Sequence, residues 1–465
     1  MSRTLFDKLW DIHVIEELGD GWALIHVDRH LLHDFSGPDA MREIESRGVR
    51  PFNPGLAFAT PDHGVSSAPG RTGLTSLAGR THYAALKRDT AAAGIRLLDV
   101  NSGSQGIVHV VGPELGIVLP GLSVACADSH TCTNGALGAL AIGIGSTDCA
   151  HVMATQTLRL KKPGNMRIDL QGRIGAGVTP KDVALHIIQT LGAAAGTGHA
   201  IEFAGSAIRA MPVEGRLTVC NLAVEMGARF GVIAPDTKTI EYVRGRRHAP
   251  AGAQLEQAVI DWRELHSDDD ARFDVDVTID VTGVAPTVTW GTSPAQAIPI
   301  DGVMPELSSF EDPVDRSAAV AAYKYMGLEP GHRLIGTPVD WVFIGSCNNA
   351  RLSDLEAAAD VVRGRHVAPG VTAWIVPGSE SVKQEAERLG LDRIFLRAGF
   401  AWRSPGCSMC AGSNGETVPP GQRCISTSNR NFMGRQGPRA RTHLASPAMA
   451  AAAAMAGAIV DARSF

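Results

Sequence analysis

A short apolar run followed directly by a helix start signal limits the fold of this chain more than any other feature. Residues 340–346, DWVFIGS, have the length and composition of a buried strand. Residues 353–356, SDLE, then match a capping box ahead of an alanine-rich helix. Strands that alternate with helices are typical of α/β proteins. The sequence therefore predicts an α/β fold, with Cys347 in a loop between a strand and a helix.

Other segments fit short elements joined by tight turns. The chain contains 51 glycines and 26 prolines, and these residues favour turns. A helix is predicted from Thr179-Pro180 to a stop at Gly192, and Ser446-Pro447 predicts the start of a packed terminal helix. Residues 273–281 alternate apolar and polar, which predicts a strand with one wet face. Prolines and glycines between about 283 and 315 predict a domain connection.

Charge and cysteine content exclude several classes of protein. The 465 residues suffice for about three domains of ordinary size. With 43 basic against 48 acidic residues, the chain lacks the positive excess of a nucleic-acid clamp. Eight cysteines are too sparse for a secreted disulfide scaffold, and no segment has the apolar length of a secretory signal or a membrane span. We expect a soluble cytoplasmic protein with no nucleic-acid or membrane partner.

The cysteines near the C-terminal end form the sharpest chemical pattern. Cys407 and Cys410 have C-x-x-C spacing, and Cys347 lies in its own loop upstream. Three thiolates can converge on one metal centre, although spacing alone leaves a redox pair or unlinked cysteines open. In a four-iron cluster, three protein ligands would leave one iron available as a Lewis acid. The remaining five cysteines are expected to be small buried residues: Cys126, Cys132, Cys149, Cys220 and Cys424.

Two acid and histidine pairs and two arginines are weaker signals. Asp62-His63 and Asp128-Ser129-His130 each place an acid beside an imidazole, as general acid chemistry requires, but most such pairs are surface or capping groups. Arg430 and Arg435 suit a carboxylate clamp, or are ordinary exposed arginines. The glycines at 135, 138, 143 and 145 match no nucleotide-binding pattern and are expected to let backbones pack closely.

Taken together, the motifs resemble those of the aconitase superfamily, and within it the isopropylmalate isomerase branch. The similarity extends over nearly the whole chain. It includes TLFDKLWDIHVI, VDRHLLHD, PDHGVSS, GIVHVVGPELGIVLPG, ADSHT, HVMATQTL, FIGSCNNARLSDLEAAA, GCSMC, STSNRNFMGRQG and RTHLASPAMAAAAA.

The resemblance implies a role for each matched residue. Cys347, Cys407 and Cys410 correspond to the ligands of one [4Fe-4S] cluster per chain. The implied catalytic residues are Asp62, His63, His109, Asp128, Ser129, His130 and Glu225. Those implied to bind substrate are Asn221, Asn429, Arg430 and Arg435.

The resemblance also implies an architecture and a partner. It implies three α/β/α domains around the cluster, at residues 1–170, 171–285 and 286–465, the last carrying the cysteines. A fourth, swivelling domain, with the serine that removes the substrate C–H proton, is then expected on a separate small subunit. The implied activity is that of a hydro-lyase in leucine biosynthesis. It would isomerise 2-isopropylmalate and 3-isopropylmalate through 2-isopropylmaleate.

Several departures from the family pattern keep alternatives open. The usual C-T-N-S is Cys347-Asn348-Asn349-Ala350 here, the stretch after Cys410 differs, and the usual H-E is His33-Asp34. A paralogue acting on another 2-substituted malate, such as citramalate or a homocitrate-like acid, is the main alternative. A cluster-free RNA-binding protein and a catalytically inactive scaffold are the others.

Overall fold

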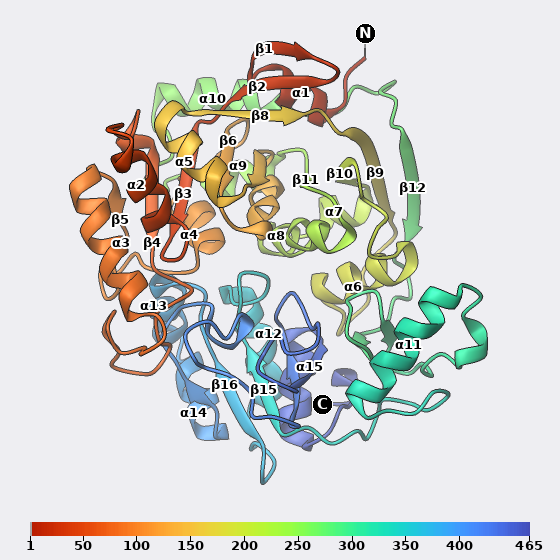
Figure 1. The fold of residues 1–465 in the computed structure, drawn as a ribbon. Coiled ribbons are helices and arrows are strands. Elements are labelled where there is room, and N and C mark those ends of the chain that lie inside the picture. Colours follow the sequence, from red (N-terminus) through yellow and green to blue (C-terminus); the bar gives the residue numbers. More distant parts are fainter. Residues whose placement is uncertain (1) are drawn as a thin grey trace. The chain divides into compact units, whose positions relative to one another are not determined.

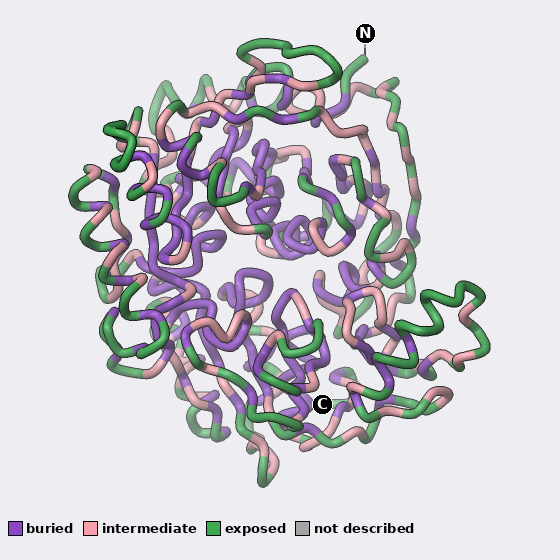
Figure 2. Tube along the Cα trace, viewed as in Figure 1, coloured by how far each residue is buried: buried purple, intermediate pink, exposed green. Residues whose placement is uncertain are grey.

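The computed structural model describes residues 2–465, which form two compact units. Unit 1 comprises the chain up to Val65 together with Gly79–Arg173 and Ala194–Val281. Unit 2 comprises Ser66–Ala78, Ile174–Ala193 and Thr282–Phe465. Figure 1 traces the elements of each unit, and Figure 2 shows that their strands are mostly buried, with exposure concentrated on outer helices and loops.

Unit 1 contains a five-stranded parallel sheet in the order β5-β4-β3-β6-β7. Its strands are β3 (Arg29–His33), β4 (Ala57–Thr60), β5 (Arg96–Leu97), β6 (Ser123–Cys126) and β7 (Leu140–Gly143). Residues of β4 and β6 are buried throughout, as expected for a parallel sheet covered on both faces. The accompanying helices are α2 (Gly37–Ser46), α3 (Arg80–Ala93), α4 (Val108–Glu114) and α5 (Ser146–Thr155).

A second parallel sheet of unit 1 has the order β11-β10-β9-β12. It consists of β9 (Gly164–Gln171), β10 (His199–Ala204), β11 (Phe230–Val232) and β12 (Val275–Asp280). Strand β12 confirms the alternation predicted for residues 273–281, since its exposed positions alternate with less exposed ones. Its helices are α7 (Ser206–Ala210), α8 (Val213–Asn221), α9 (Thr237–Val243) and α10 (Ala253–Arg263). An antiparallel sheet of β1 (Val14–Gly19), β2 (Trp22–His26) and β8 (Thr157–Lys161) completes the unit with α1 (Leu5–Asp11).

Glycines allow the two parallel sheets of unit 1 to approach the 3-10 helix η2 (Ser129–Leu137). A Cβ atom on Gly135 would lie 1.9 Å from the carbonyl oxygen of Gly231 in β11. A Cβ atom on Gly143 would lie 2.7 Å from the carbonyl oxygen of Asp128. Close backbone packing is therefore confirmed for Gly135 and Gly143, whereas a Cβ atom on Gly145 would meet only the side chain of Asp148, at 3.8 Å.

Unit 2 is built on a parallel sheet in the order β17-β16-β15-β18-β19. Its strands are β15 (Trp341–Ile344), β16 (Thr372–Ile375), β17 (Ala401–Trp402), β18 (Arg423–Ser426) and β19 (Arg441–Leu444). Its helices are α6 (Pro180–Leu191), α11 (Pro313–Met326), α12 (Leu352–Val362), α13 (Glu380–Arg388), α14 (Leu391–Ala398) and α15 (Pro447–Ala456). Helix α15 starts after Ser446, as predicted, and is buried from Pro447 to Ala454. Within residues 2–465, no helix is both long enough and apolar enough for a bilayer crossing.

Two details of unit 2 differ from the sequence predictions. Strand β15 is where predicted, but α12 begins at Leu352 with Arg351 as its N-cap. The reason is that the carboxylate of Asp354 accepts the backbone N–H of Arg351 at 3.0 Å, two residues earlier than the predicted box. The predicted connection after residue 283 holds a hairpin of β13 (Thr287–Thr289) and β14 (Ala297–Pro299). The division into three domains stays a prediction.

Short 3-10 helices complete the connections of both units. Besides η2 they are η1 (Pro54–Leu56), η3 (Leu222–Met226), η4 (Leu307–Ser309), η5 (Ser408–Cys410) and η6 (Ala462–Ser464). Helix η5 carries the C-x-x-C motif, and η3 carries Glu225. Short helices of this kind commonly connect longer elements.

The fully buried His30 in β3 makes stability depend on pH. Burial lowers the pKa of its imidazole from 6.5 to about 4, so the unfolded chain takes up a proton at a higher pH than the native chain does. Native stability contributed by the neutral ring is therefore lost as the pH falls below 6.5. Between pH 7.5 and pH 5 we expect His30 to account for a loss of about 2 kcal/mol in the free energy of unfolding.

Urea denaturation of wild type and His30→Gln at both pH values measures this loss. In His30→Gln, the difference in the free energy of unfolding between pH 7.5 and pH 5 should be about 2 kcal/mol smaller than in wild type. His332→Gln, at an exposed histidine, should retain the wild-type difference. An unchanged pH difference in His30→Gln would contradict the assignment.

Candidate active site

Acidic and histidine residues of unit 1, most of them predicted, collect at one edge of its five-stranded sheet. His33 ends β3, Asp62-His63 follow β4, and Asp128 follows β6. These strands are parallel neighbours, so their carboxyl ends meet at the same edge. Ligand sites of open α/β sheets lie at this edge.

Asp62 and His63 form a direct pair. The Nδ1 atom of His63 lies 2.5 Å from Oδ1 of Asp62, and the other carboxylate oxygen accepts the backbone N–H of Val108 at 2.9 Å. Burial opposes ionisation of the fully buried Asp62, but the charge and hydrogen bond of His63 outweigh it. The pKa of Asp62 is therefore below its usual range, and its carboxylate stays ionised to orient the ring.

The carboxylate of Asp128 is shared by histidines from three segments. Its Oδ2 atom lies 3.4 Å from Nε2 of His63, and its Oδ1 atom lies 3.2 Å from Nε2 of His109. Oδ1 also accepts the backbone N–H of His130 at 2.7 Å, which caps η2. Burial alone would raise the pKa of Asp128, but the hydrogen bonds from these histidines hold it well below the usual value. Both ring nitrogens of His63 therefore face carboxylates.

The tautomer of His109 follows from its neighbours. Asn134 directs its amide nitrogen to the backbone oxygen of Thr131 at 3.0 Å, which fixes the orientation of the amide. The same nitrogen lies 3.3 Å from Nδ1 of His109 and must be the donor there. In the neutral ring the proton is therefore on Nε2, which faces Asp128.

Two more predicted residues join this group through η2 and η3. Nε2 of His130 lies 3.1 Å from Oε1 of Glu225. Asn221 donates its amide to the hydroxyl of Thr133 at 2.7 Å, and Asn221 is fully buried. Ser129 is exposed at the start of η2. The structure thus joins six of the seven predicted catalytic residues in one polar network: Asp62, His63, His109, Asp128, His130 and Glu225.

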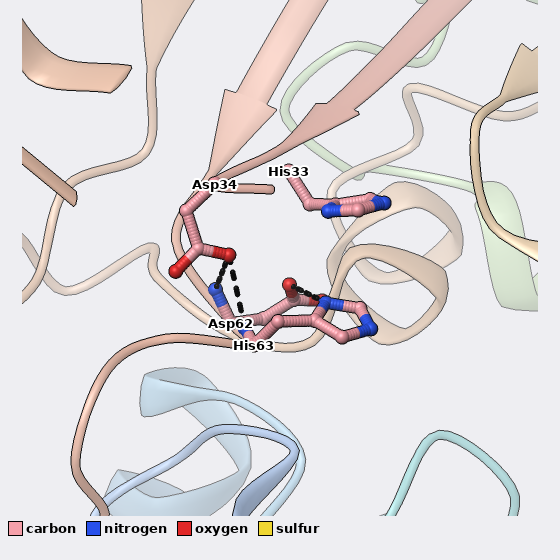
Figure 3. A group of neighbouring side chains, drawn as sticks. All are labelled: His33, Asp34, Asp62 and His63. Atoms are coloured by element: carbon pink, nitrogen blue, oxygen red, sulfur yellow. Dashed lines mark hydrogen bonds and ion pairs between the residues drawn. The ribbon is translucent and has the colours of Figure 1, made fainter. Parts of the chain in front are cut away.

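Asp34 and His33 belong to the same site and were not predicted as functional residues. Asp34 accepts the backbone N–H groups of Asp62 and His63 at 3.3 and 3.0 Å (Figure 3). It also accepts the backbone N–H of Gly64 at 2.7 Å. The ring of His33 lies over that of His63 with 4.4 Å between centroids. Burial and the adjacent charge of His63 lower the pKa of His33, which favours its neutral form. The departure from H-E at residues 33 and 34 was the only sequence signal for this pair.

His33, Asp34, Asp62 and His63 could offer ligand atoms to a metal, because these atoms lie within 4.8 Å of one another. Hydrogen bonds already account for the arrangement. Both oxygens of Asp34 accept backbone N–H groups, and both oxygens of Asp62 are engaged by His63 and Val108. We therefore describe this group as a hydrogen-bonded acid and histidine site.

The predicted cysteines of unit 2 lie in loops at the carboxyl edge of its parallel sheet. Cys347 follows β15, and Cys407 and Cys410 follow β17. Two serines beside them have left-handed backbone, Ser346 with φ +91° and Ser408 with φ +48°. Such conformations are costly for residues other than glycine and persist where the surroundings enforce them. The loops are therefore held in a specific shape.

Asn429 connects two of these thiols. Its Oδ1 atom lies 3.3 Å from Sγ of Cys410 and 3.9 Å from Sγ of Cys347. The backbone oxygen of Cys407 accepts the N–H of Cys410 at 2.9 Å, which closes the C-x-x-C turn. All eight cysteines are buried thiols. Two sulfurs around one amide, with a third cysteine in the same turn, fit the ligand set of an iron-sulfur cluster.

Lys181 is a fully buried lysine that the sequence did not reveal. It lies in the first turn of α6, is fully buried, and donates to Oδ1 of Asn348 at 2.7 Å and to the backbone oxygen of Ser428 at 2.8 Å. These acceptors are next in sequence to Cys347 and Asn429. A lysine in a first helical turn is usually exposed, so no sequence pattern distinguished it.

Arg430 and Arg435 lie in the loop after β18 and are partly buried. The Nε atom of Arg435 is buried and has no hydrogen-bond partner within residues 2–465. Buried polar atoms are normally satisfied, so this one favours a ligand. A carboxylate would match the planar guanidinium.

Comparison with known proteins assigns the chain to a family. The model of the Aconitase family (aconitate hydratase) matches residues 7–457. The chain belongs to the aconitase family. The predicted family and α/β fold class are thereby confirmed.

Two proteins illustrate the relationship. The 3-isopropylmalate dehydratase large subunit 1 of Bradyrhizobium diazoefficiens is 60% identical over 464 residues, which cover 100% of this chain and 97% of that protein. The solved structure of Thermococcus kodakaraensis aconitase X, in its holo form, superposes with a TM-score of 0.47 at 13% identity. That match covers 88% of this chain and 84% of the other.

Replacing Asp34 tests whether its carboxylate holds the Asp62-His63 turn. Asp34→Asn keeps the shape but turns one acceptor into a donor that faces backbone N–H groups. We expect the free energy of unfolding to fall by about 2 kcal/mol in urea denaturation, because buried donors lose their acceptor. Asp39→Asn, at an exposed carboxylate of α2, should change it by less than about 0.5 kcal/mol. Equal losses in the two variants would contradict the anchoring role.

Proposed function

We propose that this chain is the large, catalytic subunit of a 3-isopropylmalate dehydratase. The observation that carries the proposal is its 60% identity, over its whole length, to a protein of that name. The activity is the isomerisation of 2-isopropylmalate and 3-isopropylmalate by removal and return of water, with 2-isopropylmaleate as the alkene. It places the chain in leucine biosynthesis.

The proposal assigns a [4Fe-4S] cluster to Cys347, Cys407 and Cys410. The burial of these thiols and the contacts of two of them with Asn429 support it. When bound, the cluster supplies a Lewis-acidic iron that favours departure of a hydroxyl group. Lys181 donates to Asn348 and Ser428, which adjoin Cys347 and Asn429 in sequence, and its ammonium group would favour the negative charge of the thiolates that hold the cluster.

The acid and histidine residues of unit 1 are proposed to move the proton that the leaving hydroxyl requires. A hydroxide ion is a poor leaving group, and protonation by a positioned imidazole removes much of this barrier. His63 is the best placed donor because Asp62 and Asp128 face its two ring nitrogens and stabilise its charged form. His109 and His130 hold Asp128, and Glu225 holds His130.

The substrate carboxylates are assigned to the arginines of unit 2. A guanidinium binds a carboxylate through two parallel hydrogen bonds, and it also stabilises negative charge that builds up on the adjacent carbon. The base that removes the C–H proton is proposed to be a serine on a small subunit. The words "large subunit" in the name of the relative support such a partner. The working enzyme is then a heterodimer.

Cluster loading and substrate choice test the proposal together. The chain, reconstituted anaerobically with iron and sulfide and mixed with its small subunit, should bind both elements in equal amounts and convert 2-isopropylmalate. Cys347→Ser should lower bound iron and lose activity, because one ligand is gone. Cys424→Ser, at a buried cysteine outside the motif, should bind as much iron as wild type.

The outcomes of a panel of 2-alkylmalates separate the remaining possibilities. Preference for citramalate or another 2-alkylmalate would reject the named substrate and retain the dehydration chemistry. A wild-type chain that binds no iron would reject the dehydratase proposal as a whole.

The carboxylate assignment predicts the behaviour of Arg435→Lys. An ammonium keeps the charge but cannot form the paired hydrogen bonds, so KM should rise about 10- to 100-fold. Steady-state kinetics of the reconstituted enzyme give this value. Arg397→Lys, at an exposed arginine of α14, should leave KM unchanged. A wild-type KM in Arg435→Lys would remove this arginine from the substrate site.

A further inference from the structure

The C-x-x-C turn contains a serine whose backbone is held against its own preference. Ser408, between the two cysteines, has φ +48° and is almost fully buried. A left-handed conformation is easily adopted by glycine and costs other residues about 1 kcal/mol or more. The serine hydroxyl donates to Oε2 of Glu416 at 2.6 Å. Glu416 is therefore in direct contact with the strained position of the turn.

Glu416 gathers donors from three segments of unit 2. Oε1 accepts the backbone N–H of Ser67 at 2.8 Å, the hydroxyl of Ser66 at 2.9 Å and a guanidinium N–H of Arg403 at 2.9 Å. Oε2 accepts the hydroxyls of Ser67 and Ser408, each at 2.6 Å. The side chain is only 12% exposed. So many donors around one buried carboxylate leave it little freedom to move.

Arg403 is fixed as firmly as its partner. Its guanidinium carbon lies 3.5 Å from the centroid of the Trp374 ring, and its backbone N–H donates to the oxygen of Ile375 in β16. Its side chain is 11% exposed. Removal of one charge from a buried pair is strongly destabilising, because the other charge is left without compensation. The pair therefore ties the turn to the sheet.

Ionisation of Glu416 agrees with this arrangement. Burial alone would raise its pKa, but the hydrogen bonds from Ser408 and Ser67 and the charge of Arg403 lower it below the usual value. A charged carboxylate forms shorter and stronger hydrogen bonds than a neutral acid. The hydroxyl of Ser408 thus has a strong acceptor in a fixed place.

We propose that Glu416 is a positioning residue that, through the hydroxyl of Ser408, keeps Cys407 and Cys410 in the conformation that binds an iron-sulfur cluster. The inference rests on the proposed function for the presence of the cluster. The hydrogen bond to Glu416 explains the shape of the turn, because it offsets the energetic cost of the left-handed backbone at Ser408. Glycine at position 408 would need no such compensation.

Cluster retention in four variants tests this role. Wild type, Glu416→Gln, Ser408→Ala and the double variant Glu416→Gln/Ser408→Gly are reconstituted, and loss of the cluster absorption is followed in excess chelator. We expect Glu416→Gln and Ser408→Ala to lose the cluster about tenfold faster than wild type, because the hydrogen bond that holds the turn is weakened or lost. The double variant should recover most of the retention. Glu385→Gln, at the exposed ion pair with Arg388 in α13, is the matched control and should behave as wild type.

Recovery by glycine separates positioning from a general structural role. Glu416→Gln lowers the thermal unfolding temperature of the cluster-free chain in either case, because Arg403 loses its partner. If Glu416 only stabilised the unit, glycine at 408 would not restore cluster retention. That result, or wild-type retention in Glu416→Gln, would overturn the inference. If Glu416→Gln does not fold, two variants at position 408 decide the question. Ser408→Gly must retain the cluster longer than Ser408→Ala. Absence of iron in the wild-type chain would instead overturn the proposed function, and this inference with it.

Discussion

Buried carboxylates that accept backbone N–H groups hold the functional loops of both units in place. Asp34 binds three consecutive N–H groups of the Asp62-His63 turn. Asp128 caps η2, and Glu416 binds the N–H of Ser67 beside the cysteine turn. Loops at the ends of parallel strands cannot use the ladder of the sheet for their own backbone groups, and a buried donor without an acceptor is costly. Charged acceptors meet this need and fix the side chains that follow.

The two units differ in the charged side chains that lie near their functional residues. In unit 1, Asp62, Asp128 and Glu225 surround imidazoles, so these carboxylates stabilise the positive charge of an imidazole that holds a proton. In unit 2, Lys181 and the arginines lie in the same unit as the thiols, which suits anionic ligands. Dehydration of a hydroxy acid needs both properties, a proton for the departing oxygen and positive charge for the carboxylates. The proposed activity thus draws on the two units in different ways.

Sequence patterns predicted the parts of the site that depend on residue type and spacing. The C-x-x-C pair, the strand before Cys347 and the acid-histidine pairs were visible because each is a local pattern in the sequence, and their order along the chain matched the family motifs although each alone is ambiguous. The helix after Cys347 starts at Leu352 because Asp354, rather than Glu356, reaches back to its N-terminal backbone. The sequence pattern favours Ser353 with Glu356, because Arg351 is not a typical N-cap residue, and only the three-dimensional path of the chain selects Asp354.

The residues that sequence analysis missed act through groups that are distant along the chain. Asp34 works on backbone atoms of residues 62–64, and backbone N–H groups leave no pattern in a sequence. Lys181 reaches Asn348 and Ser428, so its burial depends on contacts far from its own helix. The strands β13 and β14 have three residues each, too few for a period to be recognised, and β13 is fixed by the bond from Thr287 to Asp182. Long-range hydrogen bonds of buried polar and charged side chains thus determine much of the site and its surroundings, and a single sequence does not display them.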